Sequence, residues 1–155
     1  MHWLRPACWF GVALVAACGG GDDITSPVLA PGPPADALSG TWRMSFENMT
    51  DGSTTCHTNV FTVTLIRDGS TVSGAFGPIA LTCSTGGYTA NQRMPAGEIV
   101  NGSISGSTVT FDLETPELHQ AGVLSRNGLT GTARWVLTGR TLDGVWLALQ
   151  PGRPV

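Results

Sequence analysis

Apolar and polar residues alternate along two early segments of the chain. Residues 42–46 read Trp-Arg-Met-Ser-Phe and residues 61–65 read Phe-Thr-Val-Thr-Leu, so an apolar side chain recurs at every second position. A period of two is typical of a β-strand with one buried face and one solvated face. Threonine and valine are frequent, and their β-branched side chains suit a pleated surface. No segment with a helical period and the length of a helix occurs between residues 39 and 150.

Turn signals divide this region into strands. Asp68–Gly69 and Asn127–Gly128 supply the positive φ angles that tight hairpin turns need, and Gly106–Ser107 and Gly139–Arg140 mark two further turns. We therefore expect an all-β domain of eight or nine antiparallel strands in an up-and-down meander. The predicted strands cover residues 41–48, 57–67, 70–77, 79–84, 97–105, 108–114, 118–125, 129–138 and 141–149.

A weak repeat indicates the shape of the sheet. Residues 72–76, 129–135 and 142–146 each place an apolar residue, a glycine and an aromatic residue on one face of a strand. Glycine inside a strand often marks a close approach of another backbone, and glycine beside a large ring fits bulky side chains into a tapering interior. The repeat favours a sheet that closes into a small barrel, with a β-sandwich as the alternative. The rings expected to point inward, enough to fill a small barrel, are Trp42, Phe46, Phe61, Phe76, Phe111, Trp135 and Trp146.

The opening and closing strands resemble those of the calycin barrels, the group that includes lipocalins and avidins. The resemblance is carried by Leu-Ser-Gly-Thr-Trp at residues 38–42, by residues 129–135 and by residues 142–146. It implies that the indole of Trp42 plugs one end of the barrel. In a lipocalin a late arginine, here Arg134 or Arg153, would pair with that indole. Residues 43–45 depart from the polar biotin-binding turn of the avidins, so no biotin-binding residue is carried over.

The first 18 residues have the three zones of a secretory signal. Arg5 supplies a positive charge, residues 7–17 are apolar, and small residues precede Cys18. The apolar run is too short for a transmembrane helix, which needs about 20 residues. Val-Ala-Ala-Cys at residues 15–18 resembles the lipobox of bacterial lipoproteins, which implies that Cys18 is acylated and that the chain is cut directly before it. The alternative is an ordinary signal peptide that leaves a soluble secreted protein.

Four segments follow from this organisation. Residues 1–17 are the expected signal peptide, residues 18–38 the lipidated cysteine with a flexible tether rich in glycine and proline, residues 39–150 the barrel domain, and residues 151–155 a short tail. We expect the protein in the cell envelope, attached to a membrane by its N-terminal lipid. Among Gram-negative lipoproteins an aspartate after the cysteine favours the inner membrane. Residue 19 is glycine, so the outer membrane is favoured over the inner membrane.

The charge balance argues against one class of partner. The chain has 8 basic and 11 acidic residues, a formal net charge of −3, and no basic stripe interleaved with aromatic residues. Such a stripe is the footprint of nucleic-acid binding. We therefore expect no nucleic-acid partner.

Cys56 and Cys83 are the two cysteines of the expected exported domain. Two cysteines in an oxidising compartment usually pair, so we predict a disulfide between them. The alternative is a metal or redox site formed with His57, but the sequence lacks a C-x-x-C spacing or a second histidine nearby. We expect no metal and no cofactor.

The sequence carries no recognisable catalytic motif. His57 and His119 lie far apart along the chain, and no G-x-S-x-G elbow accompanies them. Asp112, Glu114 and Glu117 form an acidic cluster, which we interpret as a solvated loop rather than a pair of catalytic carboxylates. We therefore expect that the protein is not an enzyme.

The segment from Ser84 to Ala96 is predicted to be a long loop, and loops of this length are often functional, so it is a candidate lid over a barrel mouth. Two functions remain open. One is a structural or interaction module with a filled barrel that contacts an envelope protein from outside, and the other is a binding protein that holds a small apolar ligand in the barrel. For the second function, the candidate ligand-binding residues are Trp42, Tyr88, Arg93, Met94, Trp135 and Trp146.

Overall fold

Eleven β-strands and no α-helix make up the part of the chain that the computed structural model describes, which is residues 37–114, 118–126, 128–137 and 139–152. This confirms the predicted all-β class. No helix that could cross a membrane occurs among these residues. The strands are β1 (Gly40–Thr50), β2 (Thr54–Thr58), β3 (Phe61–Asp68), β4 (Thr71–Phe76), β5 (Ile79–Thr85), β6 (Tyr88–Met94), β7 (Gly97–Ser105), β8 (Thr108–Leu113), β9 (Leu118–Leu124), β10 (Leu129–Leu137) and β11 (Arg140–Leu149).

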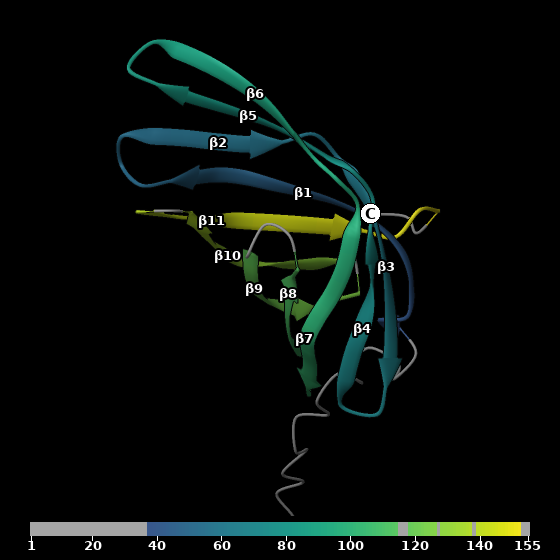
Figure 1. Cartoon of the computed structure of the whole chain (residues 1–155). Helices are drawn as coiled ribbons and strands as arrows, with labels where there is room; N and C mark the ends of the chain where they lie inside the picture. The colour runs from purple at the N-terminus through teal and green to yellow at the C-terminus, as the bar shows by residue number, and fades with distance from the viewer. Residues whose placement is uncertain (1–36, 115–117, 127, 138, 153–155) are drawn as a thin grey trace, which may run out of the picture.

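Strands from the whole length of the domain close into an antiparallel barrel (Figure 1). Neighbouring strands follow the order β1, β3, β4, β7, β8, β9, β10 and β11, and β11 pairs with β1 to complete the ring. The closing ladder runs from Arg43 opposite Leu149 to Thr50 opposite Asp143. A closed ring has no free edge, which distinguishes it from two sheets packed face to face. The barrel prediction is confirmed, and the sandwich alternative is wrong.

Strands of the barrel continue beyond it as a smaller sheet. Short breaks at residues 59–60, 77–78 and 95–96 separate β2 from β3, β4 from β5, and β6 from β7. On one side of these breaks lie the barrel strands β3, β4 and β7. On the other side, β2, β5 and β6 form a sheet with the end of β1, in the order β1, β2, β5, β6. We call this sheet the arm, and Figure 1 shows it leaving the barrel at one end.

Prolines contribute to the division between barrel and arm. Pro78 and Pro95 lie at two of the breaks and have no N–H to donate to a ladder. Two backbone hydrogen bonds still link neighbouring strands at the breaks, from Asn59 N to Ala80 O at 3.0 Å and from Gly77 N to Thr62 O at 2.8 Å. The β2–β5 ladder keeps the register of the β3–β4 ladder. The arm is therefore a continuation of the barrel strands with the same alternation of faces.

The arm corrects two sequence predictions. The predicted strand 57–67 is two strands, β2 and β3. The predicted loop 84–96 is the end of β5, a tight turn at Gly86–Gly87 and β6, so the expectation of a long loop is wrong. Positive φ angles of 53° and 87° at the two glycines allow this turn. β6 carries no apolar alternation because it is exposed on both faces, and the pattern analysis therefore missed it.

Aromatic side chains pack inside the barrel. All seven rings predicted to point inward are buried, with at most 5% of any of these residues exposed. Trp42 lies at the end where β1 begins, and its Nε1 donates a hydrogen bond to the carbonyl oxygen of Leu38 at 2.8 Å. Farther along, Phe111 meets Trp146 edge to face, with 5.6 Å between ring centroids. The indole of Trp42 is therefore buried near the end of the barrel where β1 begins.

The glycines of the repeat lie where backbones approach closely. A Cβ on Gly74 would overlap the carbonyl oxygen of Thr64, and a Cβ on Gly131 would overlap that of Ala121. A larger residue at either position would push neighbouring strands apart. The repeat therefore marks close contacts between strands, which is the reading made from the sequence.

Candidate functional site

The mouth of the barrel below the arm is apolar and nearly filled. The volume of its cavity is about 10 Å³. That is room for about one water molecule, whereas a pocket for a small organic ligand spans about 300–1,000 Å³. The residues around this cavity include Phe46, Met49, Thr58, Leu81, Met94 and Trp135.

Two buried polar atoms near the mouth have no hydrogen-bond partner among the described residues, Trp135 Nε1 and Gln120 Oε1. Both residues are only 3% exposed. The amide nitrogen of Gln120 does have a partner, because Nε2 donates a hydrogen bond to the carbonyl oxygen of Leu118 at 3.1 Å. An unpaired buried polar group costs about 1–3 kcal/mol. The indole N–H of Trp135 is thus a free donor at the edge of the apolar cavity.

The predicted ligand-binding tryptophans do not form one site. Trp135 lines the mouth cavity together with Met94. Trp42 lies near the start of β1, and the Trp146 indole is already engaged, because its Nε1 donates to the carbonyl oxygen of Thr132 at 3.0 Å. Of the three predicted ligand-binding tryptophans, the structure brings Trp135 alone to the mouth.

The two remaining predicted residues lie on the arm. Tyr88 follows the Gly86–Gly87 turn at the tip and is 84% exposed. Arg93 is exposed on the opposite face of β6 from Met94, because neighbouring residues of a strand point to opposite faces. Neither residue is among those that line the mouth cavity.

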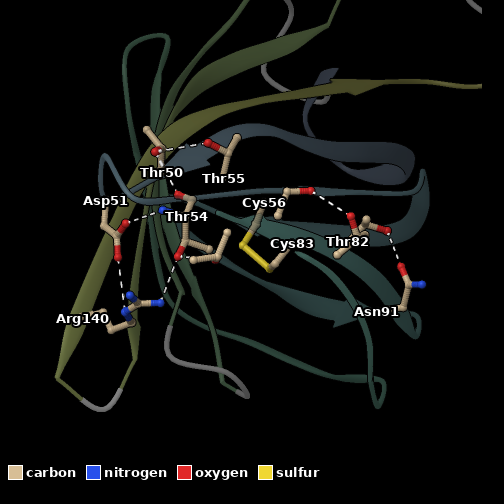
Figure 2. The surroundings of a disulfide bond; sticks show 12 residues. Thr50, Asp51, Thr54, Thr55, Cys56, Thr82, Cys83, Asn91 and Arg140 are labelled. Atoms are coloured by element: carbon tan, nitrogen blue, oxygen red, sulfur yellow. Dashed lines mark hydrogen bonds and ion pairs between the residues drawn. A yellow bond between two sulfur atoms is a disulfide. The ribbon is translucent and has the colours of Figure 1, made fainter. Parts of the chain in front are cut away.

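A disulfide crosses the middle of the arm (Figure 2). Cys56 on β2 lies directly opposite Cys83 on β5, with 4.1 Å between their Cα atoms, and the two sulfurs are bonded. This confirms the predicted pairing. Side chains add cross-strand hydrogen bonds on both sides of it, between Thr54 and Thr85 at 2.7 Å and from Thr82 Oγ1 to Asn91 Oδ1 at 2.9 Å. Covalent and polar links therefore hold the arm together where the aromatic core does not reach.

An ion pair ties the first turn of the arm to the barrel strand β11. Asp51 Oδ1 accepts hydrogen bonds from the N–H groups of Ser53 at 2.9 Å and Thr54 at 2.8 Å, and Arg140 Nε lies 3.3 Å from Asp51 Oδ2. Arg140 Nη1 also donates to Thr54 Oγ1 at 3.0 Å (Figure 2). The backbone hydrogen bond from Thr54, followed by those from Ser53, lowers the pKa of Asp51 to about 2.

Two larger hollows lie on the outside of the barrel. One groove, of about 680 Å³, crosses β8 to β11, and another, of about 380 Å³, lies over β1 and β11. The first contains a row of polar pairs: His119 Nδ1 lies 2.7 Å from Asp112 Oδ1, and Arg134 Nε donates to Asp143 Oδ1 at 2.9 Å. His119 and Arg134 are themselves opposite each other, so the row spans four strands.

The row consists of one hydrogen-bonded pair, His119 with Asp112, and one ion pair, Arg134 with Asp143. The hydrogen bond from Arg134 to Asp143 raises the pKa of the guanidinium above its usual value. In the described part of the chain, Asp112 is the hydrogen-bond partner of His119 and no hydroxyl group bonds to the imidazole. Because Arg134 bonds to the exposed Asp143, its side chain lies on the outer face of the barrel and does not pack beside Trp42. The expectation of a lipocalin-like pair between Trp42 and Arg134 is wrong.

Several predicted residues lie outside the described part of the chain. These are Cys18 with the tether up to residue 36, Glu117 in the acidic cluster, and Arg153. Among the residues that are described, no group of three or more His, Cys, Asp or Glu side chains is placed to hold a metal ion.

Sequence reasoning missed the open edge of the arm at β6 and the contact between Asp51 and Arg140. A Gly-Gly pair between two strands is a hairpin signal, and Gly86–Gly87 could have indicated β6. The Asp51 contact joins residues that are distant in sequence, and no local pattern reports it. Comparison of the chain with protein-family models, with curated proteins and with solved structures finds no match.

Proposed function

We propose that the chain is a lipid-anchored protein of the cell envelope whose small barrel is a non-catalytic interaction module. The observation that carries the proposal is the filled interior. Buried rings pack inside the barrel and the mouth cavity has room for about one water molecule, whereas larger hollows and the arm lie outside. A barrel with no space inside meets its partners through its outer surfaces.

The direction of β1 supports display of the arm to the surroundings. β1 begins at Gly40, two residues before Trp42, and its last residues pair with β2 of the arm (Figure 1). A lipid on Cys18 would therefore hold the barrel by the end opposite the arm and leave the arm accessible. Ala37 and Leu38 are buried against the barrel, so the predicted tether of residues 19–38 is wrong at its C-terminal end. A tether of residues 19–36 would reach roughly 20–55 Å, depending on whether it is a coil or an extended polyproline chain.

Acylation of Cys18 is tested by matched serine variants. Cys18→Ser should move the protein from the membrane fraction to the soluble fraction, because the thiol that takes the lipid is gone. Cys8→Ser is the control and should remain in the membrane fraction, since Cys8 lies within the expected signal peptide. Continued membrane association of Cys18→Ser would refute the anchor. Density-gradient separation of the two membranes then tests the proposed outer-membrane location.

The second candidate function is a carrier for a small apolar ligand. It is favoured by one observation, the unpaired Nε1 of Trp135 at the edge of the apolar cavity beside Met94. Native mass spectrometry of the full chain, purified from its own organism, separates the two functions. A mass equal to that of the acylated polypeptide supports the interaction module. A retained small molecule that is lost from Trp135→Phe supports the carrier.

A further inference from the structure

β6 is the last strand of the arm and has a free edge. It pairs with β5 on one side, and among the described residues no strand pairs with its other side. Six of its seven residues are exposed, and Met94 is partly buried. Native proteins often protect such edges with charged side chains, proline or a bulge, and between Tyr88 and Met94 β6 has no proline, no bulge and one charged residue, Arg93. An edge strand with so little protection is a surface ready for pairing.

The hairpin geometry determines which backbone groups face outward. In the tight turn at Gly86–Gly87, the N–H of Tyr88 returns to the carbonyl of Thr85. Backbone groups of an antiparallel strand alternate between its two sides, so those of residues 88, 90, 92 and 94 face β5. The backbone groups of Thr89, Asn91 and Arg93 therefore point to the free edge.

The spacing of the disulfide agrees with this alternation. The Cα atoms of Cys56 and Cys83 are 4.1 Å apart, which is the close spacing of a pair that exchanges no backbone hydrogen bonds. The backbone groups of Cys83 consequently face β6, where Cys83 lies opposite Ala90. Two separate parts of the arm thus give the same orientation for β6.

We propose that the free edge of β6 pairs antiparallel with β6 of a second copy of this chain, with Asn91 on the two-fold axis. The proposal rests on the proposed function, because it names the partner of the interaction module. When residues 88–94 of two copies pair antiparallel over their full length, residue 91 of one copy lies opposite residue 91 of the other. Because Asn91 points its backbone groups outward, this register also brings together all the outward N–H and C=O groups of both strands.

The side chains suit the same register. Arg93, the one charged residue of β6, lies opposite the partner's Thr89, so the two guanidinium groups do not face each other. On the other face, Tyr88 lies opposite the partner's Met94, which allows a contact between the ring and the thioether. Tyr88, the most exposed large hydrophobic residue in the described part of the chain, gains a partner in this way.

Membrane attachment makes such a short contact effective. A strand of seven residues buries less surface than the interface of a stable soluble dimer. Two chains held in one membrane by their lipids meet at a high effective concentration, which favours a weak contact. Antiparallel pairing in one membrane requires the two arms to lie along its surface, and tethers that reach roughly 20–55 Å permit this. We therefore expect pairing in the membrane, and in solution only when the protein is concentrated.

Spin labels on the full, acylated chain in liposomes test the register. Labels at Asn91→Cys should lie in contact, because the Cα atoms of a hydrogen-bonded pair are about 5.5 Å apart. Labels at Tyr88→Cys should show a distance near 20 Å, because six residues of strand separate the two positions. Absence of both distances would overturn the proposal, and so would a closest approach at a position other than Asn91.

A matched pair of substitutions tests the role of the backbone. Asn91→Pro removes an outward N–H and leaves the ladder with β5 intact, whereas Asn91→Ala removes the same side-chain hydrogen bond with Thr82 and keeps the N–H. With the label at Tyr88→Cys, the 20 Å distance should be lost in Asn91→Pro and retained in Asn91→Ala. Equal behaviour of the two variants, with unchanged circular dichroism, would overturn pairing through this edge.

The same samples distinguish failure of the anchor from failure of the pairing. Flotation with the liposomes reports the anchor independently of the label distances. A chain that does not float refutes the anchor, and the label distances are then measured in concentrated solution, where their absence overturns the pairing. A different protein that co-purifies with the wild type and not with Asn91→Pro would assign the edge to that protein and overturn the second copy as its occupant.

Discussion

Cys56 and Cys83 face each other across β2 and β5, outside the closed ring of the barrel, so their disulfide cross-links the arm and not the aromatic core. The bond closes a loop with a sequence separation of 27 residues, which contains the bend from β2 into β3 and from β4 into β5. Replacing both cysteines by serine should lower the free energy of unfolding by about 3–4 kcal/mol, because the unfolded chain regains the freedom of that loop. Urea denaturation measures the change.

Reduction of the wild-type protein provides the control for the serine variants. The reduced protein should unfold at the same urea concentration as Cys56→Ser/Cys83→Ser, since both lack the cross-link. The disulfide would have no stabilising role if oxidised and reduced protein unfolded at the same urea concentration.

The carboxyl group of Asp51 should make the protein sensitive to acid. Its pKa of about 2 in the folded state lies below the value of about 3.9 in an unfolded chain. A pKa depressed by folding gives a stabilisation that is fully present above about pH 4 and is lost as the pH falls toward 2. We expect the thermal midpoint of the wild type to fall over this window, and to fall less in Asp51→Asn, which has no carboxyl group to protonate.

Asp68→Asn is the matched control for this pH dependence. Asp68 is exposed and ends β3 at a different turn, so its substitution should leave the acid response of the wild type unchanged. Identical midpoints of Asp51→Asn and the wild type from pH 2 to pH 5, after correction for a constant offset, would contradict the role of Asp51.

The alternation of residues 42–46 and 61–65 and the glycine repeat were sufficient to predict the barrel. Both patterns arise from the buried interior: inward positions are apolar, and glycine is required where strands meet closely. Six of the seven residues of β6 are exposed, so the strand has no such pattern and its segment resembles a loop in the sequence. A strand with almost no buried residue gives no hydrophobic alternation from which it could be predicted.

The candidate site was less accessible from the sequence for a related reason. Trp135 and Met94 come from β10 and β6, and they meet at the mouth because the ring closes and β6 ends just before the barrel strand β7 begins. Asp51 and Arg140 meet for the same reason. Such contacts depend on which strands become neighbours after closure, and residue patterns within a single strand do not contain that information.

Gly131→Ala tests why glycine recurs in the repeat. Either neighbouring strands lie too close for a side chain, or the backbone needs a conformation that only glycine adopts. Gly131 does not have a positive φ angle, so the strain of a new methyl group would come from its overlap with the carbonyl oxygen of Ala121. Overpacking of this kind typically costs about 1–3 kcal/mol. Gly77→Ala is the control, because its new Cβ would lie 3.6 Å from its nearest neighbour, the carbonyl oxygen of Thr62. Equal stability of the two variants in urea would rule out the steric explanation.

Gln120→Met tests whether the barrel interior is a filled core. The buried Oε1 of Gln120 has no partner among the described residues, while its Nε2 bonds to the carbonyl oxygen of Leu118. Methionine has nearly the same length and no such acceptor, so the variant should gain about 1 kcal/mol of stability, which is the cost of the unpaired oxygen less that of the lost hydrogen bond. Gln92→Met on exposed β6 should change stability little. A loss of stability in Gln120→Met would instead mean that a water or ligand satisfies this oxygen in the native protein, which would favour the carrier function over the interaction module.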